Sequence, residues 1–217
     1  MITPGSWKFD EIVAKRFYQE AVSNIPDYEK VVEMIGPIIR KLFREKSLKL
    51  KILDVGSAIG FTVNKLQWEG FVNTYGVESS LDMIKHSQCG DHIFHCSELP
   101  HGLQWDVIII NWTLHFIKDR KKYLEAVYEA LTPGGLLFLT EKTLNSSEEE
   151  KKDYINFKKG KGISLEEINA KALALDGILI PFPIEWYYDT LQELGFKNIL
   201  MINSRFMFKT LIARKLE

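Results

Sequence analysis

One short segment, residues 51–60, limits the fold more than any other part of this chain. It reads Lys-Ile-Leu-Asp-Val-Gly-Ser-Ala-Ile-Gly, an apolar run that ends in an acid and two glycines, and a stretch of helical periodicity follows it. This order predicts a buried strand, a tight turn and the N-terminus of a helix. In an open parallel sheet, such a turn places a ligand beside free backbone N–H groups and the positive end of a helix.

The glycine spacing narrows the kind of ligand. Ala58 stands where a dinucleotide-binding loop has its middle glycine, and this disfavours the close backbone approach that a pyrophosphate requires. The next predicted strand, 73–77, is followed by Glu78, which lies about 20 residues past the loop, the distance typical of ribose recognition. S-adenosylmethionine (SAM) has a ribose and an adenine but no phosphate. The pattern therefore predicts a site for SAM or S-adenosylhomocysteine (SAH).

Apolar strands alternate with helical stretches along most of the chain, without internal repeats. This alternation predicts an α/β fold with a doubly wound parallel sheet flanked by helices. A closing hairpin with its turn at Asn203 and Ser204 adds an antiparallel strand, so we expect the seven-stranded, Rossmann-like sheet of the class I SAM-dependent methyltransferase fold. The predicted strands are 51–55, 73–77, 92–95, 106–111, 136–140, 199–202 and 206–213, and the predicted helices are 10–22, 28–44, 118–131, 164–175 and 185–194.

The chain is expected to form a single SAM-binding domain over residues 1–217, because 217 residues are enough for one well-buried core and leave little for a second. Within it we expect an N-terminal helical cap at 8–45 and an insertion on the substrate side at 144–183. The lysine-rich run 151–161 is interpreted as a solvated, mobile segment. The alternative is a lysine lid over an anionic substrate.

Composition excludes several classes of protein. The net charge is −1, so no overall field favours nucleic acid or a membrane surface, although a local patch could still hold RNA. We find no signal-peptide pattern and no apolar run of about 18 residues. The two cysteines, Cys89 and Cys96, are too few for a disulfide framework, so we expect a cytoplasmic protein. We expect no metal site, because His92 and His95 would point to opposite faces of a strand.

Ligands of open α/β sheets bind beyond the carboxyl ends of the strands, and the predicted site residues follow that rule. The segment from Asp54 to Gly60 is expected to face the methionine part of SAM, and Glu78 the ribose. Adenine would be read by Glu98 or by backbone groups after the third strand. The cofactor residues predicted from the strand ends are Asp54, Gly56, Ser57, Gly60, Glu78, Ser79, Cys96, Ser97 and Trp112.

Two further strand ends carry candidates for catalysis. His115 follows the fourth strand and is either a general base or a residue that caps a turn. Glu141 and Lys142 end the fifth strand, where they would form a surface ion pair or meet the substrate. The predicted catalytic residues are His115 and Glu141.

Several motifs together resemble the carboxy-S-adenosylmethionine synthases, a family that acts in wobble-uridine modification of tRNA. The motifs are Phe9-Asp10-Glu11, Ile25-Pro26-x-Tyr28, Asn111-x-Thr113-Leu114-x-Phe116, Pro133-Gly134-Gly135 and Glu141-Lys142. The resemblance implies that Tyr28 and Asn111 line the cofactor site, that prephenate is the carboxyl donor and that the protein forms a homodimer.

One departure from that family is serious. Where the family has a lysine followed by an arginine that binds the carboxylate on the sulfonium methyl group, this chain has Lys171-Ala172. Losing a charge-assisted partner costs about 1.5–3 kcal/mol, and a lysine lacks the planar fork of arginine. We therefore predict a SAM-dependent methyltransferase acting on a small molecule or a modified nucleoside. The alternatives are a carboxy-SAM synthase with a rearranged carboxylate site and a SAM-binding module without turnover.

Overall fold

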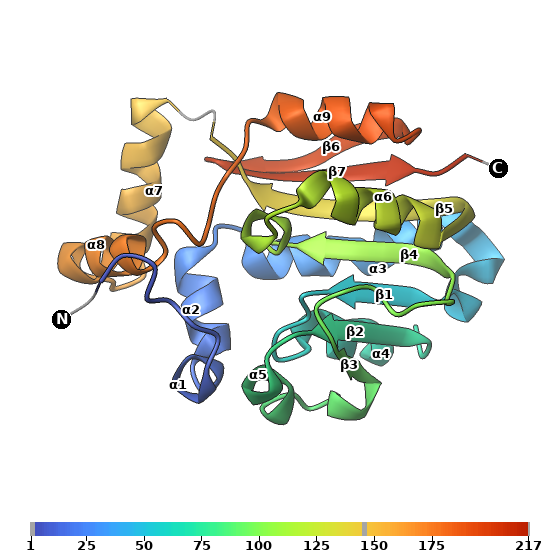
Figure 1. The fold of residues 1–217 in the computed structure, drawn as a ribbon, viewed down its shortest axis with the longest axis horizontal. Helices are drawn as coiled ribbons and strands as arrows, with labels where there is room; N and C mark the ends of the chain where they lie inside the picture. The colour runs from blue at the N-terminus through green and yellow to red at the C-terminus, as the bar shows by residue number, and fades with distance from the viewer. Residues whose placement is uncertain (1–2, 145–146, 217) are drawn as a thin grey trace.

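The computed structural model describes residues 3–144 and 147–216, and these residues form a seven-stranded sheet with helices on both faces (Figure 1). The strands are β1 Ile52–Val55, β2 Thr74–Glu78, β3 Ile93–His95, β4 Trp105–Asn111, β5 Leu131–Lys142, β6 Lys197–Arg205 and β7 Phe208–Arg214. The α-helices are α1 Glu11–Ala14, α2 Phe17–Asn24, α3 Tyr28–Phe43, α4 Phe61–Trp68, α5 Leu81–Lys85, α6 Arg120–Ala130, α7 Glu148–Gly160, α8 Leu165–Ala174 and α9 Ile184–Glu193.

The strand order is β3-β2-β1-β4-β5-β7-β6, and the first five strands of the chain are parallel. The last strand, β7, lies between β5 and β6 and is antiparallel to both. This confirms the predicted fold class. The order reverses beside β1, so the carboxyl ends of β1 and β4 diverge into a crevice where ligands of such sheets bind.

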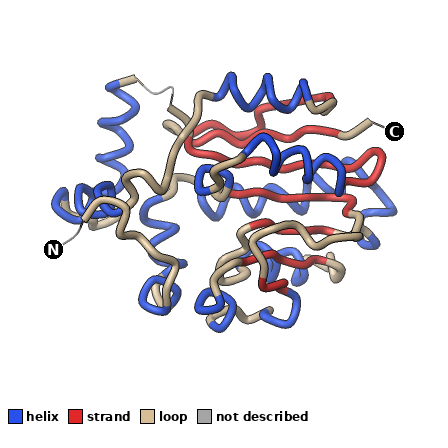
Figure 2. The backbone as a smooth tube through the Cα atoms, viewed as in Figure 1, coloured by secondary structure: helices blue, strands red, loops and turns tan. Residues whose placement is uncertain are grey.

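Two apolar layers hold the helices on the sheet. On one face, Leu124 and Val127 of α6 and Tyr187 and Leu191 of α9 are fully buried against the strands. On the other face, residues of α3 and α4 such as Ile35 and Leu66 form the second layer. Figure 2 shows these helices along the strands, whereas the loop between α8 and α9 runs past the carboxyl ends.

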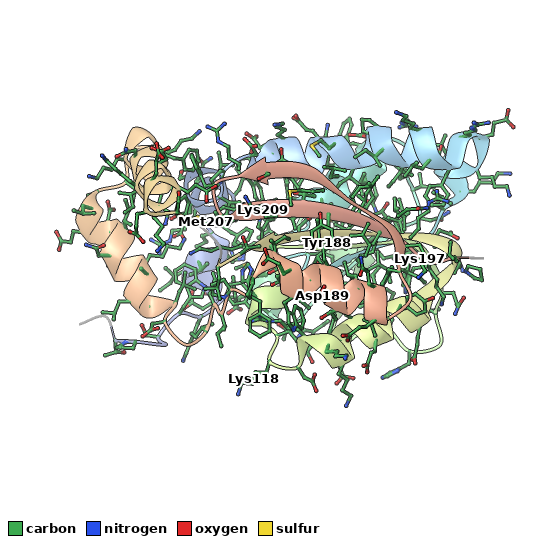
Figure 3. All side chains as sticks on the ribbon, turned by 90° about the horizontal axis from the view of Figure 1, so that it is seen from above. Lys118, Tyr188, Asp189, Lys197, Met207 and Lys209 are labelled. Carbon is green, nitrogen blue, oxygen red and sulfur yellow. The ribbon has the colours of Figure 1, made fainter. Side chains whose placement is uncertain are left out.

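The closing hairpin differs from its prediction. Strand β6 continues through Asn203 and Ser204, and the turn falls at Phe206 and Met207, with Phe206 at φ 49°. The two polar residues are accommodated in the strand because their side chains have partners: Asn203 contacts Lys30 and Asp27, and Ser204 accepts from Lys209. Seen from above, the hairpin runs from Lys197 to Met207 and Lys209 at the end near α7 (Figure 3).

Two other boundaries differ from the predicted elements. The expected helix 10–22 is two helices, because α1 contacts α5 whereas α2 contacts α3. Strand β5 begins at Leu131 rather than 136, because Leu131 pairs with Trp105 before residues 132–135 bulge out of register. The predicted turn at Pro133-Gly134-Gly135 therefore lies inside the strand.

The predicted insertion 144–183 contains α7 and α8, and its residues 145 and 146 lie outside the described part of the chain. The run 151–161 belongs to α7, which begins with a capping box between Ser147 and Glu150. The interpretation of this run as a solvated segment is wrong for one face of the helix. On that face Lys158 is buried and the Tyr154 ring packs on Phe208. No helix among the described residues is both long and apolar enough to cross a bilayer.

Candidate functional site

A cavity of about 560 Å³ opens at the carboxyl ends of β1, β2, β4 and β5, and α2, α7, α8 and the α8–α9 loop complete its wall. In Figure 1 these helices lie beyond the arrowheads of the parallel strands. Most of the predicted site residues line it: Tyr28, Asp54, Gly56, Ser57, Glu78, Ser79, Cys96, Ser97, Asn111, Trp112 and His115. Two predicted site residues, Gly60 and Glu141, do not belong to the described part of this wall.

The loop after β1 is shaped by its glycines and tied to β2. Gly56 has a φ of +67°, and a Cβ there would come within 2.3 Å of the Thr113 hydroxyl, so a side chain at this position would collide with the turn after β4. The Gly56 and Ser57 N–H groups both donate to the Val77 carbonyl. Gly60, in the left-handed region, precedes the first residue of α4 and is not part of the described cavity wall.

Two buried carboxylates occupy neighbouring strand ends. Glu78 accepts from the N–H groups of Ala58 and Ser80, each at 2.8 Å, which fixes the β1 loop to the end of β2. Asp54 is 3% exposed. Burial raises the pKa of Asp54 to about 8, and the charge of Glu78 adds to this, while a hydrogen bond from Thr62 opposes it. The carboxylate of Asp54 is therefore suited to meet a cation.

Aromatic rings and an unpaired amide lie between these carboxylates and β5. Tyr28 stacks on Trp112 at 4.8 Å and on Phe61 at 5.6 Å between ring centroids. Trp112 adopts a φ of 54° directly after β4, and its backbone N–H donates to the Thr140 carbonyl. Asn111 is 8% exposed, yet neither its amide oxygen nor its nitrogen has a partner among the described residues. A buried amide of this kind is normally satisfied by a ligand or water.

His115 and Glu141 form a buried pair. The Glu141 carboxylate accepts from the N–H groups of Leu114 and His115 at 2.8 and 3.0 Å, and it lies 2.7 Å from His115 Nδ1. Glu141 therefore holds the short 3-10 helix Leu114–Phe116 and the His115 ring together. Of the two predicted catalytic residues, only His115 lines the cavity.

On the side of the cavity that faces away from Asp54 and Glu78, the wall is basic. Lys142 ends β5, Lys158 comes from α7 and Lys171 from α8, and all three line the cavity. Burial lowers the pKa of Lys142. It lowers the pKa of Lys158 to about 8, and the charges of Lys142 and Lys171 add to this. Lys171 is ion-paired with Glu20 at 2.7 Å.

Sequence reasoning missed Tyr154, and it preferred a solvated run for the segment that contains Lys158, with a lysine lid only as the alternative. Two signals could have found them. Ser147 and Glu150 have the spacing of a capping box, which starts a helix, and residues four apart in that helix share one face.

Two other expectations concerned residues around β3. Glu98 was a candidate for reading adenine, but its side chain is 77% exposed and it is not part of the cavity wall. Cys96 and Ser97 line the cavity instead. In the described chain no group of three or more His, Cys, Asp and Glu residues is arranged to hold a metal ion.

The chemistry of the wall matches the groups that SAM carries. Asp54 and Glu78 offer carboxylates for an ammonium or sulfonium cation and for the ribose hydroxyls. The Asn111 amide has donors and an acceptor without partners, and the stacked rings of Tyr28 and Trp112 form an apolar face. The residues present therefore fit SAM.

Comparison with known proteins agrees with this fit. Residues 25–200 match the methyltransferase domain family. A carboxy-S-adenosyl-L-methionine synthase of Helicobacter hepaticus is 30% identical over 226 residues, which cover 96% of this chain and 95% of that protein. A synthase from Chromohalobacter salexigens is 29% identical over 235 aligned positions, which cover 97% of this chain and 84% of that protein. The crystal structure of a SAM-dependent methyltransferase from Thermotoga maritima, called a possible histamine N-methyltransferase, superposes with a TM-score of 0.64 at 15% identity, over 96% of this chain and 99% of that one. This last likeness concerns the fold alone.

Proposed function

Because the chain belongs to the SAM-dependent methyltransferase superfamily, close to the carboxy-S-adenosyl-L-methionine synthases, we propose that it transfers the methyl group of SAM to a small molecule or a modified nucleoside. The observation that carries this proposal is the pair Asp54 and Glu78 at adjacent strand ends, facing one cavity with the unpaired amide of Asn111. SAM, when bound, supplies a methyl group that is already a good electrophile.

The protein's own contribution is then alignment and, for some acceptors, proton removal. Glu78 and Asp54 hold the donor at the β1–β2 edge, and Tyr28 and Trp112 limit its movement. His115 follows β4 and lines the cavity. An ionised Glu141 can only accept, so it keeps the His115 proton on Nδ1 and leaves Nε2 as the base.

A second candidate function is carboxy-SAM synthesis, which the names of the two relatives support. Prephenate as the carboxyl donor is what the family resemblance implies. The composition of the cavity wall favours the first function, methyl transfer from SAM. Ala172 lies in it beside Lys171, and among the described residues of that wall there is no arginine. A planar, bidentate partner for the carboxylate of carboxy-SAM is therefore missing.

Mass analysis of the ligand that co-purifies with the protein tests these functions. SAM or SAH supports a methyltransferase, whereas a molecule heavier than SAM by one carboxylate supports the synthase. Transfer of a radiolabelled methyl group from SAM to a panel of small acids, amines and modified nucleosides then separates an enzyme from a binding module. The proposed function fails if the protein binds neither SAM nor SAH, or if it binds them and no acceptor in the panel is methylated.

A further inference from the structure

Two lysines in the cavity wall have no counter-ion. Lys142 and Lys158 both approach the ring of Tyr154, with Nζ 5.7 and 4.4 Å from its centroid. Lys158 is 9% exposed. Within residues 3–144 and 147–216, no carboxylate lies within ion-pairing distance of either ammonium group. Buried charges in proteins are normally paired, so this pair requires an explanation.

Packing alone does not provide one. A single ring attracts a cation modestly, whereas here two ammonium groups share one ring and repel each other. Burial lowers the pKa of Lys158, and the charges of Lys142 and Lys171 lower it further. The Tyr154 hydroxyl is also engaged elsewhere, since it donates to the Asn24 carbonyl at 2.8 Å. The arrangement keeps two positive charges directed at a cavity without neutralising them.

Lys171 shows the contrast. It lines the same cavity, but it is ion-paired with Glu20 at 2.7 Å and lies over the Trp7 ring at 4.6 Å. Its charge is therefore already compensated by the protein. Of the three lysines in the described part of the wall, Lys142 and Lys158 are therefore the two without an ion pair.

The position of this pair along the sheet matters. In the order β2-β1-β4-β5, Glu78 ends the first strand, Asp54 is the penultimate residue of the second and Lys142 ends the last. Asn111 at the end of β4, and Trp112 and His115 after it, lie between them. The cavity thus has an acidic pole that suits a cationic methyl donor and a basic pole on the far side of β4. A donor at one pole and an acceptor at the other would meet beside His115.

We propose that the methyl acceptor is a small organic anion, a carboxylic acid or a phosphate ester, whose acidic group lies between the ammonium groups of Lys142 and Lys158. This inference rests on the proposed methyltransferase function and names its substrate class. An acceptor held by its anionic group would present its other end toward β4. A methylene-rich or cationic acceptor would leave the buried Lys158 and the half-buried Lys142 unpaired.

The test is calorimetric titration of the SAH-loaded protein with benzoate, phenyl phosphate and the neutral analogue benzamide. We expect at least one of the two anions to bind at least tenfold more tightly than benzamide. A stronger response to phenyl phosphate than to benzoate would identify a phosphate ester, and the reverse a carboxylic acid. Lys158→Met and Lys142→Met, which keep the length of the apolar stem, should each weaken anion binding about ten- to hundredfold.

Lys159→Met is the matched control, because Lys159 is the exposed neighbour of Lys158 on α7 and does not line the cavity. It should leave anion binding unchanged. An SAH titration of each variant shows whether its donor site is intact. Equal affinity for acid and amide, no anion binding by an SAH-loaded protein, or unchanged anion affinity in both Lys158→Met and Lys142→Met would overturn the inference. Loss of SAH binding in the unmodified protein would instead contradict the proposed function itself.

Discussion

Nδ1 of His115 lies 2.7 Å from the carboxylate of Glu141, and both side chains are buried at the end of β5. The same carboxylate accepts from two backbone N–H groups of the turn after β4. Glu141 is therefore a positioning residue, which fixes both the turn and the tautomer of the histidine that faces the cavity.

Replacing Glu141 by glutamine should lower the free energy of unfolding by about 1–3 kcal/mol, because an amide cannot accept all three hydrogen bonds and leaves a buried donor unpaired. Urea denaturation measures this change. Glu193→Gln is the control, since Glu193 forms an exposed ion pair with Lys121 and should change stability by less than about 1 kcal/mol. Equal effects of the two substitutions would contradict the role given to Glu141.

His115→Gln should slow transfer to an acceptor that must lose a proton by about 10²- to 10⁴-fold, because it removes the base from the site. The measurement is kcat for that acceptor and for an acceptor that loses no proton, whose rate should change little in the variant. SAM affinity should stay close to that of the unmodified protein. An equal loss of rate with both acceptors would show that His115 only packs against the turn.

Glu78→Ala should weaken SAM and SAH binding by about 1.5–3 kcal/mol, the value typical of hydrogen bonds to a charged group. Calorimetry on the folded variant is the measurement. Glu98→Ala provides the comparison, because Glu98 is exposed and outside the cavity wall. An affinity unchanged by Glu78→Ala would remove Glu78 from the donor site.

SAM binding should release a proton from Asp54. The pKa of this carboxyl is raised to about 8 in the free protein, so it is protonated through the range between its ordinary pKa near 3.8 and pH 8. A cation beside it favours the ionised form, and affinity should therefore rise as pH increases within that range. Calorimetry at pH 6.5 (a value within that range) in buffers of different ionisation enthalpy measures the proton release. Asp54→Asn should abolish the buffer dependence, and a wild-type protein without any such dependence would refute the assignment.

The protein should not form carboxy-SAM from SAM and prephenate, and Ala172→Arg should raise its preference for carboxy-SAM over SAM, because a guanidinium restores a planar partner for the carboxylate. Competitive binding of the two ligands measures the preference. Asn169→Arg adds the same charge to an exposed position of α8 outside the cavity wall and should have little effect. Carboxy-SAM made by the unmodified protein would show that another residue has taken over the role.

The sheet and one half of the cavity could be predicted from the sequence because both depend on local patterns. Buried parallel strands are continuous apolar runs, and a polar residue at the end of such a run marks the edge where ligands bind. Asp54 and Glu78 follow from that rule, whereas Asn111 was implied by the family resemblance, and the structure places all three in one cavity.

The half of the cavity that α7 contributes could not be predicted, because long-range contacts assemble it. Helix α7 has a mostly charged sequence, and what fixes it on the cavity is the packing of Tyr154 on Phe208 and its hydrogen bond to Asn24, residues far apart in the chain. The hairpin turn was misplaced for a similar reason, since Asn203 and Ser204 find partners within the fold that make a turn there unnecessary.

The insertion of β7 between β5 and β6 makes β6 an edge strand whose only neighbour among the described strands is β7. The turn between β6 and β7 is short, so the two strands can pair locally as a hairpin, and this hairpin becomes part of the sheet only through the pairing of β7 with the distant β5. Contacts between distant strands form slowly, and unattached strands promote aggregation. The pairing of β5 with β7 is therefore the step that attaches the whole C-terminal hairpin, including Leu200 and Met201 with their 56% and 41% exposure, to the rest of the sheet.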